Sequence, residues 1–256
     1  MKQRPSFPAR LDSAPPVPQV ARGATQVAYV PDAARPQGLG MDSSAHRQRM
    51  VQLLQKQGVQ DSVVLAAMGA VERHRFVDSA LVNQAYEDTS LPIGLGQTIS
   101  KPGVVSRMIE LLRNGATGKL GRVLEVGTGC GYQAAVLSLL ASEVYSIERL
   151  RGLHDKAREN LRPMRIPNVH LLFGDGMVGY AQGAPYAAII SAAGGEAVPQ
   201  AWIDQLAVGG RLVAPVVNSG SRGGGQSLLV LDKTAGGIRQ TRLEAVHFVP
   251  LKSGVA

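Results

Sequence analysis

The stretch VLEVGTGCGY, residues 123–132, constrains the fold of this chain more than any other segment. An apolar run typical of a buried strand leads into glycines at positions 127, 129 and 131, and a helical pattern follows. Glycines let a turn tighten and leave bare backbone for a ligand to approach, while amides at the start of a helix face that ligand. A dinucleotide-binding G-x-G-x-x-G motif would carry glycine at its sixth position, where this chain has Tyr132. The pattern is instead E-x-G-x-G-x-G, beginning at Glu125.

Apolar strands and helices alternate after residue 120. We expect strands over residues 122–126, 143–148, 168–175, 186–193 and 211–217, with helices over 132–141, 149–164 and 199–210. This alternation indicates a parallel sheet covered on both faces. Residues 223–251 read as two strands about a TAGG turn, which predicts an antiparallel edge. The expected fold class is therefore α/β, a doubly wound and mostly parallel sheet with an antiparallel C-terminal edge.

The first part of the chain divides into a tail and extra N-terminal helices. Residues 1–40 hold seven of the fifteen prolines and few large apolar groups, so we expect a disordered extension. One helix is expected after a cap at Asp42 or Ser43, and a second after a cap at Asp61. A third should begin at Pro102, which suits a first helical turn, and continue to residue 115.

Charge and cysteine content narrow the classes of partner. The formal net charge is +8, which raises nucleic acid as a partner, but +3 of it lies in residues 1–40 and no run of five like charges occurs. We expect no nucleic-acid partner. Cys130 is the only cysteine, which fits a cytoplasmic location. No apolar stretch approaches the roughly 18 residues of a membrane span, and the scattered histidines predict no metal site.

Two further acids end the next two expected strands. Glu148 lies 21 positions after Gly127, where a carboxylate can accept both hydroxyls of a ribose. Asp175, in FGDG, ends the third strand and can meet an adenine amino group. Each acid alone is more often a solvated residue at a strand end. Three signals at successive strand ends indicate a nucleoside site, and the glycine pattern resembles the first motif of S-adenosylmethionine-dependent methyltransferases.

Six segments make the chain similar to the protein-L-isoaspartate O-methyltransferase family, from about residue 47 to residue 251. They are RFVDSA, LPIGLGQTIS, RVLEVGTGCGYQAAVL, YSIERLRGL, HLLFGDG and VHFVPL. GQTIS is the most specific, because ordinary methyltransferases lack it. The resemblance implies a Rossmann-like methyltransferase domain over 41–256, with helices and substrate loop in 41–115 and the cofactor-binding sheet in 116–256. It also implies methyl transfer from S-adenosylmethionine to the free α-carboxylate of isoaspartyl residues, which initiates the repair of damaged proteins and peptides.

The resemblance assigns roles to individual residues. The active-site serine of the family falls on Ser100 with Thr98 beside it, and the substrate loop includes Gln97 and Ile99. The positions that bind the cofactor fall on Glu125, Gly127, Thr128, Gly129, Gly131, Glu148, Asp175 and Gly176. The chain departs from the family at Tyr186–Ala187, usually Phe-Asp, at Gly194–Gly195, where prolines are common, and at His247, where arginine is frequent. We expect the protein to act as a monomer.

The segment GLGQTISKPG, residues 94–103, carries hydroxyls but no neighbouring base. An α-carboxylate is ionised at neutral pH, and a sulfonium is already an activated methyl donor, so no proton must move. Alignment of the two groups is what remains for the protein, and hydroxyls can orient a carboxylate without over-stabilising it. The alternative is that Thr98 and Ser100 cap the following helix. Rival functions are a methyltransferase acting on RNA or a small molecule, and a non-enzymatic binding module.

Overall fold

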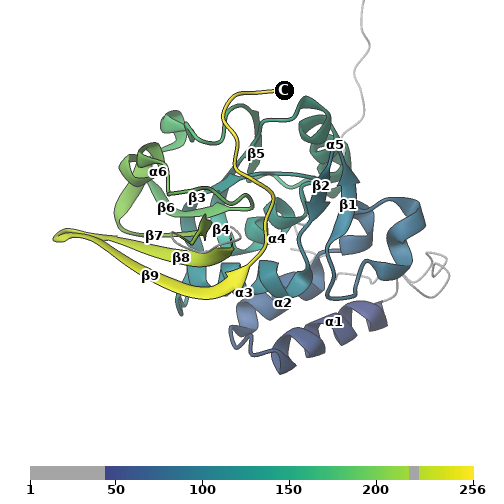
Figure 1. Cartoon of the computed structure of the whole chain (residues 1–256). Coiled ribbons are helices and arrows are strands. Elements are labelled where there is room, and N and C mark those ends of the chain that lie inside the picture. Colours follow the sequence, from purple (N-terminus) through teal and green to yellow (C-terminus); the bar gives the residue numbers. More distant parts are fainter. Residues whose placement is uncertain (1–43, 219–224) are drawn as a thin grey trace, which may run out of the picture. The chain divides into compact units, whose positions relative to one another are not determined.

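The computed structural model of the chain describes residues 44–218 and 225–256 (Figure 1). The predicted extension over residues 1–40 and the candidate caps Asp42 and Ser43 lie outside these residues. The division of the chain near residue 40 stays a prediction.

A seven-stranded sheet forms the centre of the fold, in the order β5-β4-β3-β6-β7-β8-β9. Its strands are β3 (Leu120–Val126), β4 (Ala141–Glu148), β5 (Val169–Phe173), β6 (Tyr186–Ser191), β7 (Leu206–Val217), β8 (Gln226–Thr234) and β9 (Gly237–Val246). The strands from β5 to β7 are parallel, and β8 and β9 are antiparallel to their neighbours. The predicted fold class is confirmed. The order reverses beside β3, and open α/β sheets bind ligands outside the carboxyl ends of strands at such a point.

Helices cover both faces of this sheet. The α-helices are α1 (Ser44–Lys56), α2 (Ser62–Ala70), α3 (Pro102–Arg113), α4 (Tyr132–Leu140), α5 (Arg151–Leu161) and α6 (Gln200–Gln205), and the 3₁₀ turns are η1 (Arg73–Phe76), η2 (Ser79–Gln84), η3 (Arg162–Met164) and η4 (Ala181–Gly183). Successive side chains of a strand point to opposite faces, so Val123 packs in the core cluster of α1 to α5. Leu124 packs in the cluster of α6 on the other face. No helix in the described ranges is long and apolar enough to cross a bilayer.

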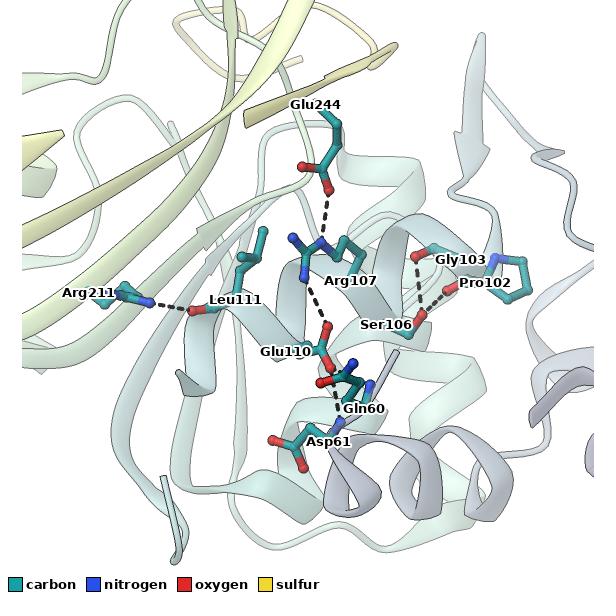
Figure 2. Close-up of polar contacts among 10 residues, drawn as sticks. All are labelled: Gln60, Asp61, Pro102, Gly103, Ser106, Arg107, Glu110, Leu111, Arg211 and Glu244. Atoms are coloured by element: carbon teal, nitrogen blue, oxygen red, sulfur yellow. Dashed lines mark hydrogen bonds and ion pairs between the residues drawn. The ribbon is translucent and has the colours of Figure 1, made fainter. Parts of the chain in front are cut away.

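Helix α3 fastens the N-terminal helices to the sheet, as Figure 2 shows. The backbone amides of Gln60 and Asp61 donate to Glu110 Oε1 at 2.6 and 2.9 Å. Arg107 bridges Glu110 and Glu244 of β9, at 3.0 and 2.9 Å. Asp61 itself caps α2, accepting from the amides of the second and third residues of that helix, so the predicted cap is confirmed. The start of α3 at Pro102 is confirmed as well.

Three expectations about secondary structure need correction. The helix predicted over 199–210 ends at Gln205, and β7 begins at Leu206. The buried Leu206 pairs with Tyr186 of β6, and the φ of +85° at Gly209 is incompatible with a helix. The helix predicted over 149–164 is shorter and ends in the η3 turn. The segment around GQTIS, predicted as a loop, is a β-hairpin of β1 (Leu91–Gly94) and β2 (Gln97–Ile99), which forms a separate two-stranded sheet.

Candidate active site

The glycine-rich turn joins β3 to α4 and is fixed to the end of β4. Gly127 and Gly129 have φ values of +90° and +57°, a backbone conformation that residues with a Cβ rarely adopt. The Gly127 amide donates to Ile147 O at 2.9 Å, and the Gly129 amide donates to Glu148 Oε2 at 2.9 Å. The other oxygen of Glu148 accepts from the Leu150 amide at 2.9 Å. This carboxylate therefore braces the turn from the neighbouring strand.

A cavity of about 470 Å³ lies over this turn. Four residues predicted to bind the cofactor line it: Gly127, Gly129, Glu148 and Gly176. The β1–β2 hairpin forms one wall through residues 95–98, which include the predicted substrate-loop residue Gln97. Residues 249–252 form another wall, where the chain leaves β9 and runs towards the start of α5 (Figure 1). The cavity has the place in the fold that the doubly wound topology predicts for a ligand.

The other four predicted cofactor residues do not line this cavity. Gly131 is the N-cap of α4 and packs against Leu161. Asp175 accepts from the amides of Met177 and Gly254, at 2.8 and 2.7 Å. Thr128 and Glu125 lie behind the turn. The roles assigned to these residues stay predictions.

Glu125 is completely buried beneath the turn. Its Oε2 is 2.5 Å from Ser146 Oγ, which lies 2.6 Å from the hydroxyl of Thr128. Burial raises the pKa of Glu125 to about 8, although the hydroxyl of Ser146 and the nearby side-chain amide of Gln133 oppose this rise. At neutral pH the carboxyl is therefore mostly protonated, and it links the back of the turn to β4 as a neutral group.

The hairpin holds the two predicted catalytic hydroxyls beside the glycine-rich turn. Lys156 of α5 donates to Ile93 O at 2.9 Å and fastens the first strand of the hairpin. Ile99 is buried, whereas Thr98 is exposed and Ser100 partly exposed. The N-cap of α3 is Lys101, whose side chain makes no capping hydrogen bond, and the amide of Gly103 in the first turn donates to Asp88 Oδ1 at 2.6 Å. Thr98 and Ser100 therefore do not cap α3, and the alternative role is wrong.

Two further cavities meet the first one at the hairpin. One, of about 430 Å³, is lined by Thr98 and Ser100 and by residues 245–249. A small cavity of about 40 Å³ is lined by Thr98, Ser100, Gln133 and residues 127–130. Thr98 and Ala192 line all three cavities, so a ligand in the first cavity and a ligand in the second would meet beside these residues.

The segment with two glycines where the family commonly has prolines is held by backbone hydrogen bonds. The Gly194 amide donates to Val249 O at 2.8 Å, and the Leu251 amide donates back to Gly194 O at 2.8 Å. Gly195 exchanges hydrogen bonds with β7, through Pro215 O and the Val217 amide. Tertiary hydrogen bonding therefore restrains this segment without the rigidity of proline.

Sequence reasoning missed several of the residues that build these cavities. Ala192, Gln133 and residues 249–252 were not predicted as site residues, although VHFVPL contributed to the family resemblance. An alanine and a short apolar segment carry no chemical signal of their own. Gln133 directly follows the glycine motif and Tyr132, which is the one signal that could have marked it. In residues 44–218 and 225–256, no three His, Cys, Asp or Glu side chains lie together as a metal site would need.

Taken together, the doubly wound sheet, the glycine-rich turn with Glu148 beside it and the adjoining hydroxyl-bearing hairpin define an α/β methyltransferase of the Rossmann-like class. The family model described as protein-L-isoaspartate(D-aspartate) O-methyltransferase (PCMT) matches residues 45–256. The chain belongs to this family.

Relatives of known name agree with this membership. A protein-L-isoaspartate O-methyltransferase of Methylibium petroleiphilum is 57% identical over 264 residues, covering 98% of this chain and 96% of the relative. One of Leptothrix cholodnii is 57% identical over 253 residues, covering 97% and 87%. A solved structure of a protein-L-isoaspartate O-methyltransferase has a TM-score of 0.72 at 28% identity, covering 82% of this chain and 67% of that chain. A Plasmodium falciparum structure in complex with S-adenosyl-L-homocysteine shares the fold alone, with a TM-score of 0.69 at 24% identity, covering 80% of this chain and 98% of that chain.

Proposed function

We propose that this chain binds S-adenosylmethionine in the cavity of about 470 Å³ and the isoaspartyl residue in the cavity of about 430 Å³. Family membership establishes the activity as protein-L-isoaspartate O-methyltransferase, which acts on isoaspartyl residues of proteins and initiates their repair, with S-adenosylmethionine as methyl donor. The observation that carries the assignment of cavities is that Thr98 and Ala192 line both of them. Donor and acceptor then meet beside the hydroxyls of Thr98 and Ser100.

The proposed chemistry needs orientation rather than proton transfer. The α-carboxylate is ionised at neutral pH, and the sulfonium carries the methyl group as an activated cation. The two charges cancel as the methyl moves, so the residues of the chain have only to align the carboxylate oxygen with the methyl. Such alignment is worth about 7–11 kcal/mol in favourable cases. Thr98 and Ser100 donate hydrogen bonds to the carboxylate and aim one oxygen at the donor.

The cations near the hairpin support this use of hydroxyls. Lys101 follows Ser100 directly and lines the cavity of about 430 Å³, but its ammonium pairs with Asp88 at 3.9 Å. Lys156 is engaged by the Ile93 carbonyl. A cation on the reacting carboxylate would stabilise the ground state and weaken its attack on the methyl, whereas hydroxyls hold it without removing its charge.

The proposal also gives roles to the acids near the cofactor. Glu148 lines the cavity, where its carboxylate can accept the ribose hydroxyls in addition to the two amides it already binds. Asp175 accepts one amide on each oxygen, and a carboxylate oxygen has a second lone pair for an adenine amino group. The backbone of Gly127, Gly129 and Gly176 lets the nucleoside lie close to the sheet.

Replacing Ser100 with alanine tests the proposed orientation of the carboxylate. We expect kcat on an isoaspartyl peptide to fall 10-fold or more, at about 1.4 kcal/mol per decade, with the Kd for S-adenosylhomocysteine unchanged. Ser142→Ala, at an exposed serine of β4, is the matched control. Turnover of the Ser100 variant close to that of wild type would remove Ser100 from the mechanism.

A pair of peptides separates the proposed function from its rivals. Wild-type protein should methylate the isoaspartyl peptide and leave the aspartyl peptide of the same sequence unmodified. Methylation of RNA or of a small molecule in place of the isoaspartyl peptide would favour the first rival. Release of S-adenosylhomocysteine in the peptide assay would exclude a non-enzymatic binding module. Action as a monomer in the cytoplasm stays part of the proposal, and sedimentation of the active enzyme tests the first point.

A further inference from the structure

Gln133 is a buried polar side chain that the proposed mechanism does not yet use. It is the second residue of α4, and it is 8% exposed. Its Nε2 atom is buried and has no hydrogen-bond partner among the residues that the structure describes. Buried amide donors in proteins are nearly always paired, because an unpaired donor loses its hydrogen bonds to water and gains none.

The position of Gln133 suggests what completes its hydrogen bonding. It lines the cavity of about 40 Å³, together with Thr98, Ser100 and the glycine-rich turn. A water molecule takes up about 30 Å³ in the liquid, so this cavity has room for a small polar group. Helix α4 starts at its edge with Gly131 as N-cap and no side-chain cap. The first turn of a helix favours negative charge because its amides point outward.

We propose that the side-chain amide of Gln133 binds a carboxylate group at the junction of the two larger cavities, through its Nε2 donor. The inference rests on the proposed function, because that function brings two carboxylates to this place. One is the α-carboxylate of the isoaspartyl residue, which lies next to Ser100. The other is the carboxylate of the methionine part of the cofactor, which enters from the side of Gly127 and Gly129. Both have the same chemistry, so Gln133 suits either.

The neighbouring acid does not oppose an anion here. The side-chain amide of Gln133 lies near Glu125 and lowers the pKa of that carboxyl against the larger effect of burial, and Glu125 Oε1 also lacks a hydrogen-bond partner in the described structure. Because that pKa is about 8, Glu125 is mostly neutral at pH 7 and does not repel a bound carboxylate. The competing account is that Gln133 serves only as a polar neighbour of Glu125.

The test is Gln133→Met, which keeps an unbranched side chain of similar length and removes the donor. Ser138→Ala, at a buried serine of the same helix that bonds to Ala135 O, is the matched control. Calorimetry compares S-adenosylhomocysteine with 5′-methylthioadenosine, a related nucleoside thioether without a carboxylate. Steady-state kinetics on the isoaspartyl peptide supply KM and kcat.

Two outcomes support the inference and identify the source of the carboxylate. If Gln133 binds the cofactor, the Kd for S-adenosylhomocysteine rises about 10-fold or more while that for 5′-methylthioadenosine stays unchanged. If Gln133 binds the substrate, KM for the peptide rises about 10-fold or more and both nucleoside affinities stay unchanged.

Two other outcomes overturn it. Unchanged affinities and KM in a folded Gln133→Met protein would show that Gln133 is only a neighbour of Glu125. Equal weakening of both nucleosides would indicate a distorted turn rather than a lost contact with a carboxylate. Either result leaves the proposed function standing if wild-type protein methylates the isoaspartyl peptide. A wild-type protein inactive on that peptide would instead remove the proposed function, and the nucleoside comparison would still report on the cofactor carboxylate.

Discussion

Replacing Glu125 with glutamine should make the stability of this protein less dependent on pH. Burial raises the pKa of Glu125 from 4.5 to about 8, against the effects of the Ser146 hydroxyl and the nearby amide of Gln133, and with a contribution from the charge of Glu148. In the unfolded chain the carboxyl returns to its ordinary pKa. Between the two values the folded state binds more protons than the unfolded state, so the free energy of unfolding falls as pH rises.

The size of this effect follows from the two pKa values. One pKa unit corresponds to 1.36 kcal/mol, so the wild-type protein should lose about 3 kcal/mol of stability between pH 5 and pH 8 through this group. Glutamine is close in size and does not titrate in this range. The free energy of unfolding of Glu125→Gln, relative to wild type, should therefore increase by about 3 kcal/mol over the same interval.

Urea denaturation at pH 5, 6, 7 and 8, followed by circular dichroism, measures this difference. Glu196→Gln, at an exposed glutamate, controls for the loss of a carboxylate at the surface. A difference between Glu125→Gln and wild type that stays constant across these pH values would refute the reasoning. At pH 7 the variant should keep its affinity for S-adenosylhomocysteine within about 3-fold. A 10-fold loss would mean that Glu125 contacts the cofactor as a charged group.

Three further substitutions test other parts of the site and fold. Gly129→Val should abolish binding of S-adenosylhomocysteine in calorimetry, because φ is +57° and a Cβ would lie 3.2 Å from Ile93 Cδ1; unchanged affinity would contradict this. Ala192→Leu should lower kcat 10-fold or more in the peptide assay by filling the junction, and normal turnover would place the transfer elsewhere. Asp61→Asn should lower the free energy of unfolding by about 3 kcal/mol at pH 7, because it leaves the buried Arg113, 2.8 Å away, without its counter-ion.

The Asp61 prediction also has a pH dependence. Burial alone would raise the pKa of Asp61, but the hydrogen bonds and charge of Arg113 and the amides of α2 outweigh it and lower the pKa. The stabilisation by Asp61 is therefore present above the ordinary value of 3.8 and is lost as pH falls through the lower folded value. The difference between wild type and Asp61→Asn should shrink on acidification, and urea denaturation at pH 7 and pH 3 measures it. An equal difference at both pH values would mean that the ion pair with Arg113 contributes nothing.

Local sequence signals predicted most of the sheet and several helix ends. Apolar runs marked β3 and β6, because a strand buried on both faces is mostly apolar. Asp61 and Pro102 marked helix starts through backbone preferences that act within one turn. The prediction of a helix over 199–210 was wrong because strand pairing with β6, and not local helix preference, fixed the backbone of its second half. Leucine is compatible with both the end of a helix and the start of a strand. Leu206 pairs with Tyr186 in β6, so it begins the strand β7.

The sequence alone determined the class of fold and the family, and it supplied the predictions of which residues bind a nucleoside and orient a carboxylate, because glycines, caps, apolar periods and strand-end acids act over short distances along the chain. Only the tertiary structure decided which of those residues face a common cavity. It turned Glu125 inward as a neutral group, folded GQTIS into a hairpin, and brought Ala192, Gln133 and residues 249–252 to the same place. These contacts depend on strand order and on packing between segments that are distant in the sequence, and neither can be predicted from a short stretch of sequence.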